Sequence, residues 1–260
     1  MSSVPSFLVG QTIADTTMRR RRDGVFLSSI IFKVIIFVYI IVKLIYTLVM
    51  ALFDRKKNYG NSEPLYKISA SKTVLVIGLG NVGKEYEGTR HNVGFEVLDD
   101  FAARNDFPGW INKKDLSCLL STAQLGENRV ILCKPTTFMN DSGQAAGAVQ
   151  HFYKIYNAST LVVYDDLAIK FGQIRARLGG SDAGHNGVKS LIAHIGDDFG
   201  RIRIGIGSEY AEKADAADFV LDKFTKSEKT QVPAILKESG VMITEFIFSG
   251  ELPHETRNIL

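Results

Sequence analysis

The stretch TVLVIGLGNVG, residues 73–83, decides the fold class. Its first five residues are apolar or β-branched without alternation, which is typical of a strand buried on both faces. The glycines that follow make the chain turn at the carboxyl end of this strand. A second run of the same kind, TLVVY at residues 160–164, predicts another buried strand of the same sheet.

Helical and strand patterns alternate along the rest of the chain. Strands are further predicted at residues 116–125, 129–133, 173–177 and 201–206, the first two joined by a hairpin at 126–128. Helices are predicted at residues 89–103, 142–156, 186–195, 214–220 and 227–248, the last interrupted or restarted at Pro233. This alternation favours an α/β fold: a three-layer sandwich around a twisted mixed β-sheet.

The amino-terminal part of the chain differs in composition from the rest. Residues 25–53 are almost entirely apolar and exceed the ~20 residues that a helix needs to cross a bilayer. Lys33 and Lys43 interrupt the run, but the apolar side chains outweigh their cost. We therefore expect a transmembrane anchor helix, with an amphipathic surface helix, a mitochondrial targeting sequence or a non-native stretch as alternatives.

These observations divide the chain into four parts. Residues 1–24 read as a disordered basic terminus, 25–53 as the anchor, 54–71 as a linker and 72–260 as one folded domain. Basic clusters flank the anchor on both sides and do not fix its orientation.

Charge and cysteine content exclude several classes of protein. The chain has a formal net charge of +3, and its basic excess lies before residue 72. Nucleic-acid binding by the domain would therefore need a local basic patch. Cys118 and Cys133 are the only cysteines and form no C-x-x-C pair, which argues against a disulfide framework or a structural zinc site.

Residues 78–83 satisfy the dinucleotide-binding pattern G-x-G-x-x-G. The third glycine should open a helix that receives the pyrophosphate on its amino terminus. Here the sequence KEYEGTRHN follows, which reads as a loop. An NAD(P)-dependent oxidoreductase that uses Gly78, Gly80 and Gly83 therefore stays an alternative.

Four loops carry similar polar side chains. They lie at residues 80–92, 134–140, 164–166 and 179–187, mostly where a predicted strand ends. Ligand sites of open α/β sheets gather at the carboxyl ends of the strands. Together the loops offer Asn81, His91, Asn140, Asp165, His185 and Asn186. This set favours neutral hydrogen bonding around one base over metal ligation.

The same segments resemble the signature motifs of bacterial-type peptidyl-tRNA hydrolases. The resemblance is carried by VIGLGNVGKEYEGTRHNVG, KPTTFMNDSG, VVYDDL and LGGSDAGHNGVKSLI, and runs from about Val74 to at least Gly207. It implies an enzyme that hydrolyses the ester between a peptide and the 3′ ribose of its tRNA. It also implies peptidyl-tRNA as the partner and neither a metal nor an organic cofactor, and we expect a monomer.

The resemblance assigns roles to individual residues. His91 matches the general base that activates water, and Asp165 matches the acid that orients it. The substrate-binding residues are expected to be Asn81, Tyr86, Phe138, Met139, Asn140, His185 and Asn186. Arg175 and Arg177 match basic positions that hold a tRNA phosphate; their spacing places both on one face of a strand.

This chemistry is consistent with ester hydrolysis at neutral pH. Imidazole is a base poised near pH 7, and a carboxylate fixes its tautomer. Amide side chains stabilise a developing oxyanion without adding charge.

The chain departs from the family pattern at Val82, at Ala168 and at Asp182-Ala183. A catalytically inactive tRNA- or RNA-binding relative is a further alternative, although His91 and Asp165 are retained. We expect a membrane-anchored protein whose domain faces the cytosol or the mitochondrial matrix, with a soluble cytoplasmic or mitochondrial protein as the alternative.

Overall fold

The structure is a computed structural model that describes residues 72–208 and 215–259. The predicted basic terminus, anchor and linker, residues 1–71, lie outside these ranges. Within residues 72–208 and 215–259, no helix is both long and apolar enough to cross a membrane.

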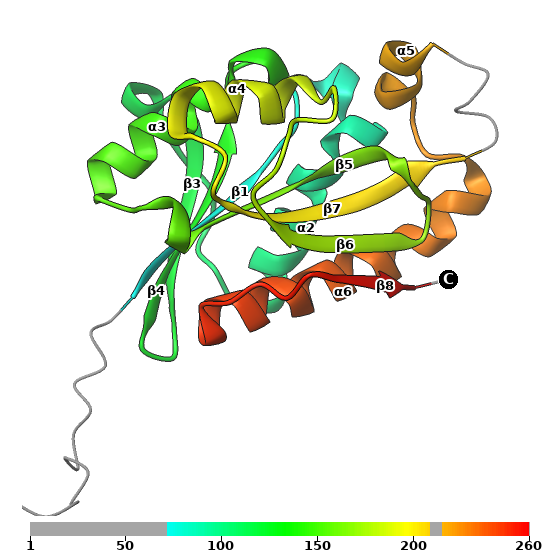
Figure 1. The fold of residues 1–260 in the computed structure, drawn as a ribbon. Helices are drawn as coiled ribbons and strands as arrows, with labels where there is room; N and C mark the ends of the chain where they lie inside the picture. Colours follow the sequence, from blue (N-terminus) through cyan, green and yellow to red (C-terminus); the bar gives the residue numbers. More distant parts are fainter. Residues whose placement is uncertain (1–71, 209–214, 260) are drawn as a thin grey trace, which may run out of the picture. The chain divides into compact units, whose positions relative to one another are not determined.

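One mixed sheet forms the centre of the described domain (Figure 1), with its strands in the order β2-β3-β4-β1-β5-β7-β6-β8. The strands are β1 Thr73–Gly78, β2 Ile111–Lys113, β3 Cys118–Leu125, β4 Asn128–Pro135, β5 Thr160–Lys170, β6 Gln173–Leu178, β7 Gly200–Gly207 and β8 Glu255–Asn258. The central strands β4, β1, β5 and β7 run parallel, and the outer strands pair antiparallel. The mixed sheet is as predicted.

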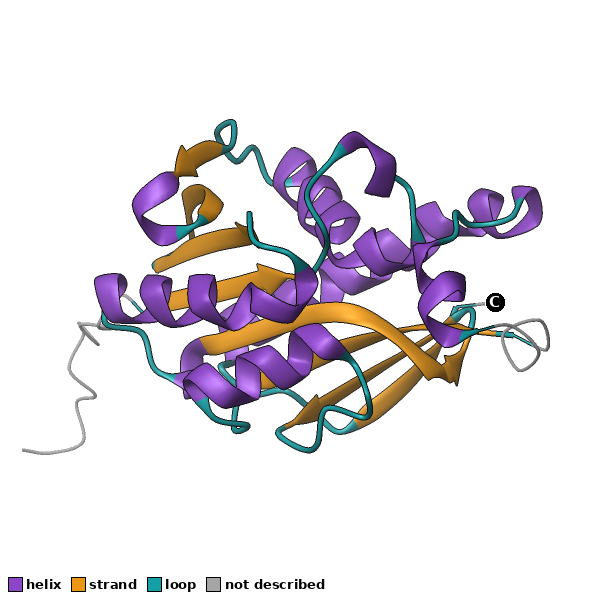
Figure 2. Cartoon of the chain, turned by 90° about the horizontal axis from the view of Figure 1, so that it is seen from above, coloured by secondary structure: helices purple, strands orange, loops and turns teal. Residues whose placement is uncertain are grey.

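Helices cover both faces of the sheet, as Figures 1 and 2 show. The α-helices are α2 Val93–Arg104, α3 Ser142–Tyr153, α4 Asn186–Ile195, α5 Ala216–Leu221 and α6 Lys226–Ser249. Short 3₁₀ turns are η1 Lys84–Tyr86, η2 Arg90–Asn92, η3 Lys114–Leu116, η4 Met139–Asp141 and η5 Asn157–Ser159. Helices α2 and α6 pack on one face, and α3 and α4 on the other.

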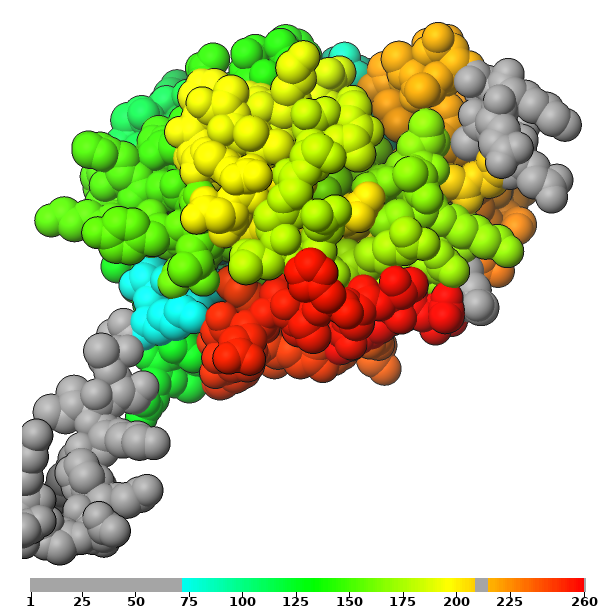
Figure 3. Space-filling model, viewed as in Figure 1, coloured from blue at the N-terminus to red at the C-terminus, as the bar shows by residue number. Residues whose placement is uncertain are grey.

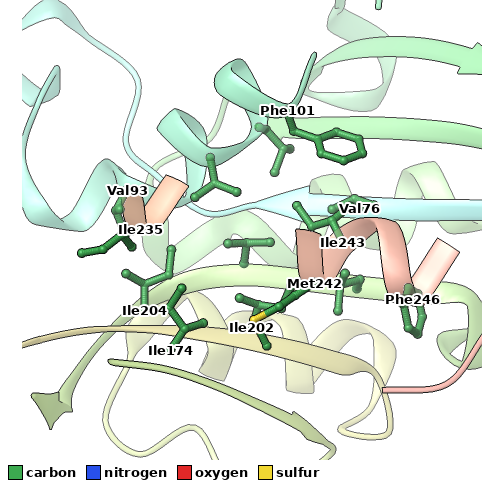
Figure 4. Close-up of a cluster of buried hydrophobic side chains, with 14 of the residues drawn as sticks. Val76, Val93, Phe101, Ile174, Ile202, Ile204, Ile235, Met242, Ile243 and Phe246 are labelled. Carbon is green, nitrogen blue, oxygen red and sulfur yellow. The ribbon is translucent and has the colours of Figure 1, made fainter. Parts of the chain in front are cut away.

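The residues of β1 supply both cores. Val74 and Val76 point into the cluster beneath α2 and α6, which Figure 4 shows, and Leu75 and Ile77 into the cluster beneath α3 and α4. All four are fully buried. The strand is thus buried on both faces, as its unbroken apolar sequence predicts.

The structure differs from the sequence prediction in the length of β5. Asp165 and Asp166 lie inside this strand and not in a loop after it, because β7 continues to pair with them. The register shifts only between Asp166 and Lys170.

Helix boundaries differ as well. The predicted helix at 89–103 begins with the 3₁₀ turn η2, and α2 itself starts at Val93. The predicted helix at 142–156 ends at Tyr153, because Lys154 adopts a left-handed conformation. Helix α6 continues through Pro233, which is exposed, so the carbonyl that loses its N–H partner lies on a solvated turn.

Candidate active site

A cavity of about 1170 Å³ lies at the carboxyl ends of β1 and β4 and beside the second half of β5. It is lined by eight of the residues that the sequence singles out: Asn81, His91, Phe138, Met139, Asn140, Asp165, His185 and Asn186. The parallel strands place them together, because β1 and β4 both end at this edge and β5 passes it at Asp165. Tyr86, on η1, is not among the lining residues.

His91 and His185 both contact the Asp165 carboxylate. Nδ1 of His91 lies 2.9 and 3.0 Å from the two carboxylate oxygens, and Nε2 of His185 lies 3.1 Å from Oδ1. An ionised carboxylate only accepts hydrogen bonds, so both nitrogens act as donors. In the neutral form of His91 the ring proton is therefore on Nδ1, which leaves Nε2 as an acceptor on a ring that lines the cavity.

The tautomer of His185 is fixed from its other side. This residue is the N-cap of α4, and its Nδ1 accepts from the backbone N–H groups of Gly187 and Val188 at 3.1 and 3.2 Å. Nδ1 therefore carries no proton, and Nε2 must carry it in the neutral ring.

Asp165 is only 2% exposed. Burial by itself would raise the pKa of this carboxyl, but the charges and N–H groups of His185 and His91 outweigh burial. They hold the pKa well below its usual range, so the group is ionised at neutral pH.

The same three side chains bring their potential ligand atoms within 4.8 Å of one another. Their hydrogen bonds do not fit a metal site, because a metal at Nε2 of His185 would push the ring proton onto Nδ1. There it would meet two backbone N–H donors. The arrangement fits an oriented imidazole base instead.

Asn81 joins two of the loops. Its Oδ1 accepts from the backbone N–H of Met139 at 2.8 Å, while its own backbone N and O pair with the Asn92 side chain at 2.8 and 2.9 Å. Asn92 was not predicted as a site residue from the sequence, although it directly follows His91. No described residue accepts from the Asn81 NH₂ group.

The other two asparagines lie at the mouth of the cavity. Asn140 is exposed and makes only a long 3.3 Å contact to Asp141, and Asn186 is the exposed first residue of α4. Phe138 is 58% exposed, whereas Met139 is buried beneath it.

Arg175 and Arg177 lie on β6, outside the lining of the cavity. They point to one face of the sheet, directly opposite Arg203 and Arg201 of β7. Arg203 forms an ion pair with Asp166 at 2.7 Å. Arg201 is 1% exposed and donates to the carbonyl groups of Gly180 and Ser181. Neither of these β7 arginines was predicted to have a role from the sequence.

The glycine pattern at residues 78–83 has a packing role. A Cβ atom on Gly78 would come within 2.4 Å of the Gly94 carbonyl, so the glycine lets β1 approach α2. Helix α2 starts only at Val93, after η1 and η2. No α-helix amino terminus directly follows Gly83, which removes the basis for the dinucleotide alternative.

Two departures from the family pattern line the cavity, one in the loop before α4 and one within β5. Ala183 adopts a left-handed φ of 50°, and the Asp182 carboxylate accepts from the backbone N–H of Gly184. The backbone N–H of Ala168 donates to Asp166 at 2.9 Å.

Comparison with known proteins identifies the family. The sequence model described as "Peptidyl-tRNA hydrolase" matches residues 75–258. A peptidyl-tRNA hydrolase of Clostridium botulinum (strain Eklund 17B / Type B) is 43% identical over 174 residues, which cover 66% of this chain and 86% of the relative. One from Shouchella clausii is 45% identical over 155 residues, covering 59% and 82%.

A solved structure has the same fold. The crystal structure of peptidyl-tRNA hydrolase from Acinetobacter baumannii aligns with a TM-score of 0.63 at 31% identity, covering 69% of this chain and 90% of that chain. The chain belongs to the peptidyl-tRNA hydrolase family.

Proposed function

We propose that this chain hydrolyses the ester bond of peptidyl-tRNA, releasing the peptide and free tRNA, with His91 as the general base. The observation that carries the proposal is the hydrogen bond from His91 Nδ1 to the buried Asp165 carboxylate, which leaves Nε2 free on a ring lining the cavity. Family membership supports the same reaction.

In the first step, Nε2 of His91 takes a proton from a water molecule as its oxygen attacks the ester carbon. The Asp165 carboxylate stabilises the imidazolium that forms and keeps the ring in place. Negative charge develops on the former carbonyl oxygen, and the amide groups of Asn81, Asn140 and Asn186 are the candidate donors to it.

In the second step, the tetrahedral intermediate collapses and the ester C–O bond breaks. The proton held on Nε2 passes to the departing 3′ oxygen of the ribose, so His91 returns to its neutral form. The carbonyl carbon keeps the oxygen of the water, which gives a free peptide acid and a free tRNA. Every proton in this cycle is moved by one imidazole.

Binding of the tRNA is assigned to Arg175 and Arg177 on β6. Two arginines on one strand face form a local basic patch, which a domain without excess positive charge needs in order to hold a phosphate. The cavity then receives the acceptor end and the attached peptide.

Replacement of His91 by alanine tests the proposal. We expect kcat on an N-acetyl-aminoacyl-tRNA to fall by roughly 10²–10⁴-fold, because general-base catalysis is lost. His151→Ala, at an exposed histidine of α3, is the matched control and should keep full activity.

Full activity of His91→Ala would contradict the assigned role. A wild-type protein that binds tRNA without any turnover would instead favour the inactive relative. Titration with NAD and NADP should show no binding.

Residues 25–53 are further proposed as a membrane anchor, with the domain in a compartment that holds tRNA. The proposal rests on the apolar sequence alone. The full-length protein should then stay in the membrane fraction after carbonate extraction, whereas release into the supernatant would contradict an anchor. We expect a monomer, which sedimentation of the domain would test.

A further inference from the structure

Arg90 directly precedes His91 in the chain and is buried, with 3% of its surface exposed. An arginine is rarely buried to this extent unless its charge is paired and its hydrogen-bonding groups are used. The partners of the Arg90 side chain all belong to the segment from α5 to the start of α6, more than a hundred residues along the chain.

The guanidinium group lies over two aromatic rings, those of Phe219 and, at 5.7 Å, of Phe224, and it makes two polar contacts. It stacks over the Phe219 ring at 4.2 Å, donates to the Phe219 carbonyl at 3.3 Å and forms an ion pair with Glu228 at 2.9 Å. Glu228 is itself fixed, because its carboxylate also accepts from the Thr225 backbone in the capping box of α6. The guanidinium therefore connects α5 to the first turn of α6.

The backbone strengthens the same connection. The N–H of Arg90 donates to the Asp222 carbonyl at 3.0 Å, and Thr89 forms an isolated β-bridge with Lys223. The segment that carries His91 is thus attached to the two residues that directly follow α5.

Helix α5 forms one wall of the cavity. Ala216, Ala217, Val220 and Leu221 line it, and Leu221 is 42% exposed. Figure 1 shows α5 in orange beside the ends of β5 and β7. With only six residues, this helix is too short to be stable by itself and needs tertiary contacts to keep its place.

We propose that Arg90 is a positioning residue, which holds α5 against the His91 segment and so fixes the apolar wall that receives the peptide part of the substrate. The proposal rests on the proposed function for the identity of the substrate. His91 is held separately, by Asp165, so loss of Arg90 should change substrate binding more than the proton transfer.

Kinetics of Arg90→Gln on N-acetyl-aminoacyl-tRNA provide the test. We expect KM to rise roughly tenfold with kcat within about twofold, because an interaction shared by bound substrate and transition state is lost. Arg90→Lys keeps the charge opposite Glu228 but loses the planar group that stacks on the ring, so its KM should lie between those of the wild type and Arg90→Gln.

Arg104→Gln is the matched control. It breaks another arginine–carboxylate pair, with Asp100. That arginine is half exposed, and its partner lies on the same helix, α2, and not on α5. Its KM and kcat should equal those of the wild type.

Hydrogen exchange gives a readout that does not depend on activity. In Arg90→Gln the backbone amides of residues 216–222 should exchange faster, while those of residues 160–166 keep their protection. Should Arg90→Gln fail to fold, Glu228→Gln keeps an acceptor and removes only the charge, and should show the same changes to a smaller degree.

Unchanged KM together with unchanged exchange in α5 would overturn the proposal, as would a fall in kcat at constant KM. Failure of the proposed function is distinguishable, because the wild type would then release no peptide while α5 in Arg90→Gln still exchanged faster.

Discussion

Asp165 accepts hydrogen bonds from two imidazoles at once while almost completely buried. Asparagine at this position would place an NH₂ group against one of the two N–H donors and favour the wrong tautomer of His91. We expect Asp165→Asn to lower kcat by roughly 10²–10⁴-fold. Asp100→Asn, which alters a surface carboxylate of α2, is the control and should keep its activity.

The lowered pKa of Asp165 also links stability to pH. A carboxyl group whose pKa is lower in the folded protein stabilises the fold above its unfolded pKa of about 3.9. That contribution is lost as the pH falls through the folded pKa. In urea denaturation, the wild type should therefore exceed Asp165→Asn in free energy of unfolding at pH 5, and the difference should shrink from about pH 4 downward. A difference that grows over that range would contradict the direction of the shift.

Asn92 satisfies both backbone groups of Asn81, and all four atoms are buried. Asn92→Ala leaves a buried N–H and a buried C=O without partners, at a cost of about 1–3 kcal/mol each. We expect a loss of about 2–6 kcal/mol in urea denaturation and a fall in kcat/KM, because Asn81 also positions the Met139 loop.

Asn105→Ala is the comparison for Asn92→Ala. Its side chain donates only to the Phe101 carbonyl at the end of α2, so we expect a loss of no more than about 1 kcal/mol. Equal losses in the two variants would show that the pairing of Asn92 with Asn81 has no special weight.

These residues also show what the sequence can reveal. His91 and Asp165 were predictable because each lies in a motif whose chemistry is recognisable from its own neighbours. Asn92 and Arg203 were not, because their partners are set by the approach of β1 to α2 and of β5 to β7. A side chain whose role is to satisfy a distant group carries no local signal.

Gly94 allows a close approach of α2 to the backbone of β5 and of the turn after β1. A Cβ atom there would lie 2.4 Å from the Val163 carbonyl and 2.6 Å from the backbone of Leu79. Since these are backbone atoms of β5 and the β1 turn, they cannot move aside as a side chain would. We expect Gly94→Ala to lower the free energy of unfolding by about 3 kcal/mol or more, measured by urea denaturation.

Gly240→Ala, inside α6, is the matched control. Its added Cβ would meet only the Phe101 ring, at an ordinary contact distance of 3.5 Å. Alanine is favoured over glycine in a helix by about 1 kcal/mol, so this variant should be as stable as the wild type or more so. A destabilised Gly240→Ala beside a stable Gly94→Ala would contradict the packing account.

The elements most clearly predicted are those whose sequence is decided by burial. Strand β1 and the first half of β5 are continuous apolar runs, and α4 has the predicted bounds. Strands β2 and β8 are short, polar and at the sheet edges, so their sequences resemble loops. β8 is held by pairing to β6 and by the ion pairs of Arg257 with three glutamates of α6 and β8. Figure 3 shows the red surface of this segment along β6.

At the scale of the whole domain, the two ends of the parallel strands have different surroundings. The cavity lies at the carboxyl end of β1 and β4, while Arg129, at the start of β4, stacks on Tyr153 at the other end. The order of the eight strands could not be derived from the sequence, because it depends on which edges the crossover helices reach. The cavity nevertheless lies where the rule for parallel strands expects a ligand, at their carboxyl ends.

The placement of positive charge in the domain leads to a final prediction. If Arg177 contacts a phosphate, its loss should weaken tRNA binding and reduce the slope of log Kd against log salt by about 1. Arg129→Ala removes an equal charge at the start of β4, the end of this strand that lies away from the cavity. This variant should leave the slope unchanged. Fluorescence anisotropy with labelled tRNA over a series of salt concentrations measures both. The domain has no excess positive charge. A long-range electrostatic effect would therefore change the salt slope of both variants equally, whereas a local phosphate contact would change only the slope of the Arg177 variant.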